Sequence, residues 1–142
     1  MRWLILDEVL SIEKLSARSL SHVPEAVYSP EFLMVEMMAQ TGALLLGAES
    51  GFLGDVVFAK IEKAEFESGW KPGDRLEIEA SCENLRQEGA WIDGFVRGPR
   101  GIVGNARFLL MNVGRLVPET TTPIAFHDAF MSHFKILEKI KH

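Results

Sequence analysis

The longest apolar run of the chain covers residues 32–48, and its pattern predicts a buried helix. Apolar side chains occur on nearly every side of this run, so the rest of the protein must surround it. Ser29 and Pro30 suit the N-cap and the first turn of such a helix. Gly47 and Gly51 mark its end. The sequence therefore predicts one long helix in the middle of the fold.

Shorter segments on both sides of this helix have the apolar patterns of strands. They are residues 3–12 and 15–22 before the helix, and residues 56–66, 75–85, 90–98 and 101–113 after it. The sequences KPGD at residues 71–74 and GPRG at residues 98–101 predict turns. One curved antiparallel sheet around one central helix is the economical packing, so the predicted fold class is α+β.

The C-terminal residues 117–142 are predicted to be a linker and a helical extension of a main domain formed by residues 1–116. Thr122 and Pro123 predict the start of an amphipathic helix. Its stripe would consist of Phe126, Phe130, Phe134, Leu137 and Lys141. Such a helix packs on its own sheet or on a second subunit, and a role at a membrane surface is a further alternative.

The composition is that of one ordinary globular domain of 142 residues, because 47% of the chain is hydrophobic and 25% is charged. The formal net charge of -5 argues against a nucleic-acid binder, which needs a concentrated basic face. The single cysteine, Cys82, has no internal disulfide partner, and no signal-peptide pattern precedes the first strand. We therefore expect a cytoplasmic protein.

Glu36 is a carboxylate inside the apolar helix, where only Gln40 and Thr41 provide polar neighbours. A carboxylate in so short a run argues against a membrane span. Burial raises the pKa of a carboxyl group, which lets it donate a proton near neutral pH. One interpretation is that Glu36 takes part in chemistry or binding. The other is that Gln40, on the same helix face, simply satisfies it by a hydrogen bond.

Two motifs stand at a fixed separation. The first is Glu-x-Met-Ala-Gln on the helix, and the second is a Lys-Ala-x-Phe strand followed by a Pro-Gly-Asp turn. The matching residues are Glu36, Met38, Ala39, Gln40, Lys63, Ala64, Phe66, Pro72, Gly73 and Asp74. Together they resemble the 3-hydroxyacyl-acyl carrier protein dehydratases of fatty-acid synthesis. The likeness covers residues 3–113 and implies the hot-dog fold, in which a curved antiparallel sheet wraps a long central helix.

The resemblance implies an acid and a base that face each other across a dry tunnel. In the family, a histidine on the loop before the helix removes a proton from the carbon beside the thioester. The helix carboxylate helps the 3-hydroxyl group leave as water. His22 lies 14 residues before Glu36, which is the family spacing, and is therefore the implied base.

Further groups are implied at the same site. Backbone N–H groups around Glu31 and Phe32 would polarise the thioester carbonyl. Gln40 and Phe58 are the other expected substrate contacts, in a tunnel lined by methionine, phenylalanine and leucine. No metal or other cofactor is expected.

His22 allows two alignments with the family. Without a gap it is the catalytic base, although Glu25 and Glu31 stand where the family has the glycines of its His-Phe-Pro-Gly loop and helix entry. With a gap, residues 14–22 form the second strand, and the loop that carries the family's histidine is trimmed. His22 then ends a strand, and the chain has no base of its own.

The resemblance also implies a homodimer or a larger assembly of dimers, in which two subunits pair edge to edge and each tunnel lies at their interface. Acyl carrier protein is acidic, so its docking would need local basic side chains. The candidates are Lys60, Lys63, Arg97, Arg100 and Arg107.

Two function classes remain open, because hot-dog proteins also include thioesterases and binding modules. The first is a dehydratase of 3-hydroxyacyl thioesters on acyl carrier protein, with His22 as base and Glu36 as acid. The second is a catalytically impaired protein that binds acyl thioesters or serves as a partner subunit. A thioesterase in which Glu36 activates water is the third choice.

Overall fold

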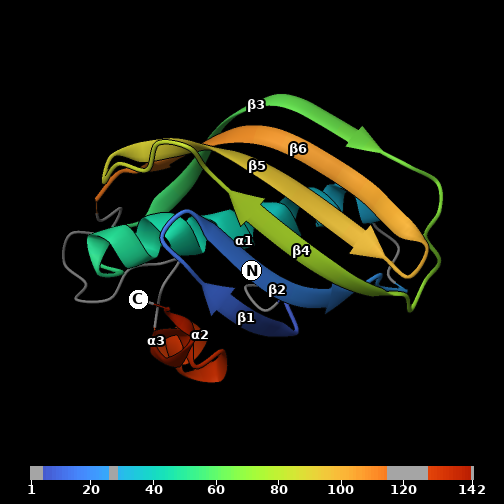
Figure 1. The fold of residues 1–142 in the computed structure, drawn as a ribbon, viewed down its shortest axis with the longest axis horizontal. Coiled ribbons are helices and arrows are strands. Elements are labelled where there is room, and N and C mark those ends of the chain that lie inside the picture. Colours follow the sequence, from blue (N-terminus) through green and yellow to red (C-terminus); the bar gives the residue numbers. More distant parts are fainter. Residues whose placement is uncertain (1–4, 26–28, 115–127, 142) are drawn as a thin grey trace.

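The computed structural model describes residues 5–25, 29–114 and 128–141. Six antiparallel strands form one curved sheet that wraps the central helix α1 (Pro30–Ser50), as Figure 1 shows. This arrangement confirms the predicted α+β architecture. Within the described residues, no helix combines the length and the apolar character needed to span a membrane.

Helix α1 begins and ends where the sequence predicts. The hydroxyl of Ser29 accepts a hydrogen bond from the backbone N–H of Phe32, and Pro30 occupies the first turn. Gly51 adopts a left-handed conformation with φ of 69°, and its N–H donates to the carbonyl of Gly47. The cap and the glycine therefore fix both ends of the helix.

Two strands precede α1 and four follow it. They are β1 (Glu8–Ile12), β2 (Ser16–His22), β3 (Val56–Phe66), β4 (Arg75–Ser81), β5 (Gly89–Gly98) and β6 (Gly101–Asn112). Their order in the sheet is β1-β2-β4-β5-β6-β3. β4 ends at Ser81, earlier than predicted, and the N–H of Cys82 then bonds to the carbonyl of Leu15 in the β1–β2 turn.

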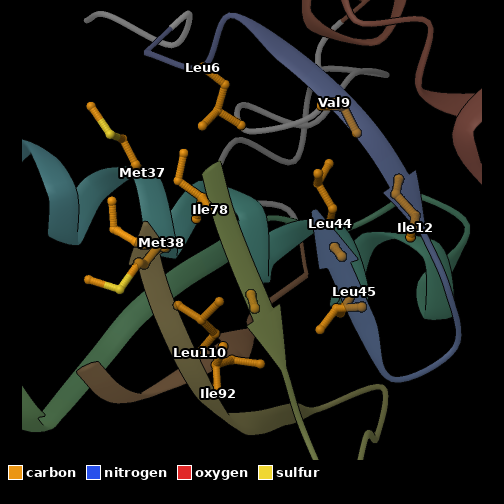
Figure 2. Close-up of a cluster of buried hydrophobic side chains, with 14 of the residues drawn as sticks. Leu6, Val9, Ile12, Met37, Met38, Leu44, Leu45, Ile78, Ile92 and Leu110 are labelled. Carbon is orange, nitrogen blue, oxygen red and sulfur yellow. The ribbon is translucent and has the colours of Figure 1, made fainter. Parts of the chain in front are cut away.

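Close contacts seat α1 on the sheet. A methyl group on Gly94 of β5 would lie 2.8 Å from the sulfur of Met38, and one on Gly42 of α1 would lie 3.0 Å from Ile92. Both glycines therefore allow the helix and the strand to approach each other. Figure 2 shows the resulting core, which joins side chains of the sheet to those of the helix. The labelled members are Leu6, Val9, Ile12, Met37, Met38, Leu44, Leu45, Ile78, Ile92 and Leu110.

The C-terminal helix differs from the prediction. Two short helices, α2 (Asp128–His133) and α3 (Ile136–Lys139), replace one continuous helix, because Lys135 between them adopts a left-handed conformation with φ of 51°. The break turns Leu137 outward, so that 70% of it is exposed. Phe126, the first residue of the predicted stripe, lies outside the described residues.

This C-terminal segment packs on its own sheet, which was one of the three predicted alternatives. The N–H of Lys141 donates to the carbonyl of Ile12 on β1 at 2.8 Å, and Ile140 forms a parallel bridge with Ile12. Phe130 and Phe134 are buried with their rings edge to face. The segment therefore covers part of the β1 edge. The division of the chain into a main domain of residues 1–116 and an extension of residues 117–142 stays a prediction.

The other sheet edge is open. Among the described residues no strand pairs with the outer side of β3, whose central residues are exposed on both faces. Ile61 in the middle of β3 is 47% exposed. An open edge strand of this length is a template for pairing with another chain.

Candidate active site

Glu36 lies on a stripe of α1 that the sheet does not cover. The stripe consists of Phe32, Glu36, Gln40 and Ala43, and Phe32 is 64% exposed. Burial of the Glu36 carboxyl among apolar neighbours raises its pKa above the ordinary value. Glu36 is therefore a carboxyl group that holds its proton more firmly than a solvated glutamate and remains reachable from one side.

The amide of Gln40 does not satisfy Glu36. Both its nitrogen and its oxygen are buried, and neither has a hydrogen-bond partner in the part of the chain that the structure describes. The interpretation of Glu36 as a carboxyl that is merely satisfied by Gln40 is therefore wrong for this structure. Buried polar groups are nearly always paired, so the two amide atoms of Gln40 are an exception among the described residues.

The start of α1 already uses part of its hydrogen-bonding capacity. The N–H of Phe32 donates to the Ser29 hydroxyl oxygen at 3.5 Å, and that hydroxyl donates to the carboxylate of Glu31 at 2.8 Å. The first of these bonds is long and therefore weak. Polarisation of a thioester carbonyl by the N–H groups of Glu31 and Phe32 stays a prediction.

Phe58 lies on the face of β3 that turns toward α1. It pairs with Leu110 in the β3–β6 ladder and stacks on Phe108, with ring centroids 5.1 Å apart. Ile61 pairs with Phe108 and shares this face. The face of the open edge strand that turns toward α1 thus carries the partly exposed apolar side chains of Phe58 and Ile61.

His22 is the last residue of β2, and the strand turns its side chain away from α1. The hydroxyl of Ser19 lies 2.7 Å from that of Thr41 on α1, so Ser19 faces the helix. Side chains alternate between the two faces of a strand. His22, three residues after Ser19, therefore lies on the outer face, where its ladder partner is Arg75.

The contacts of His22 agree with that placement. Its Nδ1 lies 2.8 Å from a carboxylate oxygen of Asp7, and 54% of the side chain is exposed. Residues 23–29 lead from His22 to α1. The alignment with a trimmed loop predicts just this position at the end of a strand. Within one subunit, His22 and Glu36 lie on opposite sides of the sheet.

Curated relatives decide the family. The 3-hydroxyacyl-acyl-carrier-protein dehydratase FabZ of Herpetosiphon aurantiacus is 31% identical over 120 residues, with 71% of this chain and 85% of the relative covered. The FabZ of Granulibacter bethesdensis is 38% identical over 95 residues, with 63% of this chain and 55% of the relative covered. The chain belongs to the FabZ dehydratase family. No family model matches it.

Solved structures confirm the hot-dog fold of this FabZ-family chain. The dehydratase heterocomplex ApeI:P of Xenorhabdus doucetiae has a TM-score of 0.64 at 14% identity and covers 78% of this chain and 83% of that one. The protein smu.793 of Streptococcus mutans, bound to acetyl CoA, has a TM-score of 0.61 at 18% identity and covers 75% of this chain and 88% of that one. Identities this low support the fold and not the reaction.

Most of the basic residues expected to attract acyl carrier protein are already paired. Lys63 lies 3.3 Å from the carboxylate of Glu65, and Arg100 pairs with Asp74. Arg107 pairs with both Glu62 and Asp93 and lies over the ring of Trp91. Lys60 and Arg97 form no ion pair with any described residue. Docking of this FabZ-family chain on an acidic carrier through these five residues stays a prediction.

Sequence reasoning missed Asp7, the partner of His22. The sequence contains no clear signal for the face of His22, because the apolar residues Ala17 and Leu20 fall on opposite faces of a strand formed by residues 16–22. In the structure His22 shares a face with Arg18 and Leu20, opposite to Ser19, which faces the helix. The position of Asp7 beside His22 depends on strand pairing, which a single sequence does not specify.

Proposed function

We propose that this protein removes water from 3-hydroxyacyl thioesters carried on acyl carrier protein and releases trans-2-enoyl thioesters. The observation that carries the proposal is Glu36, a carboxyl with a raised pKa at the position of the family's helix motif. The name of the relatives supports the same substrate class. The open stripe around Glu36 gives a thioester access to it.

The proposed chemistry uses Glu36 as the acid. A base removes a proton from C2 of the acyl chain, and the electron pair of that C–H bond forms the C2–C3 double bond. The C3–O bond breaks, and the carboxyl of Glu36 donates its proton to the leaving hydroxyl, so that water departs. The raised pKa favours this role, because it keeps the proton on Glu36 until the C–O bond breaks.

We propose that two subunits pair along β3. This strand is the open edge of the sheet, and its face toward α1 carries the partly exposed apolar residues Phe58, Ile61 and Phe66. Pairing there would extend the sheet and cover the stripe around Glu36. The dry site that acid catalysis requires would then form between the subunits.

The experiment measures turnover of a 3-hydroxyacyl thioester on acyl carrier protein by this protein, purified from its own cells with any subunits that accompany it. Replacement Glu36→Gln should reduce kcat/KM by roughly 10²- to 10⁴-fold, the usual contribution of a general acid. Glu49→Gln is the matched control, because Glu49 is an exposed carboxylate on the same helix. Equal rates for the two variants would refute the proposal, and release of free thiol without enoyl product would indicate a thioesterase.

A second candidate is an acyl-thioester-binding subunit that lacks turnover of its own. The position of His22 favours it, because the side chain of this residue faces away from α1 and is held by Asp7. The name of the fold neighbour from Xenorhabdus doucetiae, a dehydratase heterocomplex, supports the idea of unlike subunits. Binding of the thioester without turnover by the isolated chain would favour this candidate.

A further inference from the structure

The proposed reaction needs an acid and a base on the α1 side of the sheet. The chain has four histidines, and His127 and His142 lie outside the described residues. Of the other two, His133 is exposed on α2 in the segment that packs by β1. His22 lies on the outer face of β2, bonded to Asp7. The described part of the chain therefore brings a carboxyl and no imidazole to the site.

The described residues of a second copy of this chain do not supply the missing imidazole. Pairing along β3 brings the α1 stripes and β3 strands of two copies together. His22 of either copy belongs to β2, which three strands, β4, β5 and β6, separate from β3. Two identical subunits would therefore contribute two Glu36 carboxyls to the interface and leave both His22 side chains on the outer faces.

We propose that the working enzyme pairs this chain with a non-identical hot-dog subunit that carries a histidine on the loop before its own central helix. This inference rests on the proposed dehydratase function and assigns the two halves of the site to different chains. The chain described here supplies Glu36, which donates the proton to the leaving hydroxyl. The partner supplies the imidazole, which removes the C2 proton.

The surface that receives this partner consists of the β3 edge and the uncovered stripe of α1. No strand of the described residues pairs with the outer side of β3, so its backbone groups there are open to sheet extension. The surface also carries Phe32 on α1, which is 64% exposed, and Ile61 on β3, which is 47% exposed. Gln40 lies on the same stripe of α1, and its two buried amide atoms have no hydrogen-bond partner among the described residues. A partner histidine that approaches over this surface would reach the same side of the sheet as Glu36.

The first test uses the isolated chain and free imidazole as the probe. On the proposal, the chain alone turns over a 3-hydroxyacyl thioester on acyl carrier protein about 10²- to 10⁴-fold more slowly than the native complex. Free imidazole should raise the rate of the isolated wild type and of the control Glu49→Gln by the same factor. It should not raise the rate of Glu36→Gln, because the acid is then missing as well.

The second test purifies the tagged chain from its own cells and identifies the chain that accompanies it by mass spectrometry. The expected partner is a hot-dog protein with a histidine before its central helix, and turnover by the complex should be lost on Glu36→Gln in this chain. A native complex that contains only copies of this chain overturns the inference.

Other outcomes separate the inference from the proposed function. If the isolated wild type is as active as the native complex, the base belongs to this chain, and the inference fails while the dehydratase function stands. Loss of that activity on His22→Ala would identify the base directly. Failure of imidazole to raise the rate of an inactive isolated chain also overturns the inference. If no preparation, including the native complex, dehydrates the thioester, both proposals fail.

Discussion

Glu36 and His22 show how far local environment decides the role of an ionisable residue. The apolar helix around Glu36 disfavours its charged form, and the sheet leaves one side of it accessible. His22 has a carboxylate partner and solvent around it. The first residue has the surroundings of a catalytic group, whereas the second has those of an exposed, hydrogen-bonded surface residue.

The pKa of Glu36 makes a prediction about stability and pH. Because burial raises this pKa above the ordinary value of 4.5, the folded chain keeps a proton that the unfolded chain has already lost. The contribution of Glu36 to stability is therefore full below pH 4.5 and is lost as pH rises through the raised pKa. Urea unfolding at several pH values should show the wild type losing stability relative to Glu36→Gln as pH rises. Parallel stability curves would contradict the raised pKa.

At the scale of the elements, the contact between α1 and β5 depends on Gly94. A methyl group there would lie 2.8 Å from the Met38 sulfur and 3.0 Å from its Cβ. Because the Cβ cannot swing away as the sulfur can, Gly94→Ala should destabilise the fold by about 1–3 kcal/mol. Chemical denaturation measures this. Gly69→Ala is the control, since nothing lies within 4 Å of that position. Equal stability of both variants would show that α1 and β5 are not closely packed at Gly94.

The helix and the strands were predictable because each follows from local pattern. Ser29, Pro30 and Gly51 mark α1 in the sequence, and the alternation of residues 75–81 marks β4. The break in the C-terminal helix was not predictable, because Lys135 has no local reason for a left-handed conformation. The packing of the segment against β1 accompanies that break, and such tertiary contacts override propensity.

The candidate site was predictable in part for the same reason. Glu36 stands out as a charge in an apolar run, which any reading of the sequence detects. The face that His22 occupies depends on whether residues 16–22 form a strand. The spacing between His22 and Glu36, taken alone, favours His22 as the catalytic base instead. The unpaired amide of Gln40 was missed because hydrogen-bond satisfaction depends on three-dimensional neighbours.

For the whole molecule, assembly should depend on the apolar face of β3. Ile61→Glu puts a charge at the middle of the open edge, where it would be desolvated on pairing, so subunit association should weaken by at least about tenfold. Light scattering coupled to gel filtration measures the oligomer across concentrations. Ile102→Glu is the control, because Ile102 is similarly exposed but lies at the start of β6, distant along that strand from Phe108, the ladder partner of Ile61. If both variants dissociate to the same extent, the subunit interface does not depend specifically on the apolar face of β3.

The C-terminal segment bonds to the β1 edge of the sheet, whereas no described strand pairs with the β3 edge. Lys141→Pro removes the N–H that bonds to the carbonyl of Ile12, whereas Lys141→Ala keeps it. The proline variant should lose about 0.5–1.5 kcal/mol of stability. It should also form assemblies larger than those of the wild type, because the β1 edge becomes available for pairing in addition to the β3 edge. Thermal unfolding and light scattering test the two effects. If Lys141→Pro assembles as Lys141→Ala does, the segment does not guard the edge, and another feature of β1 must keep it from pairing.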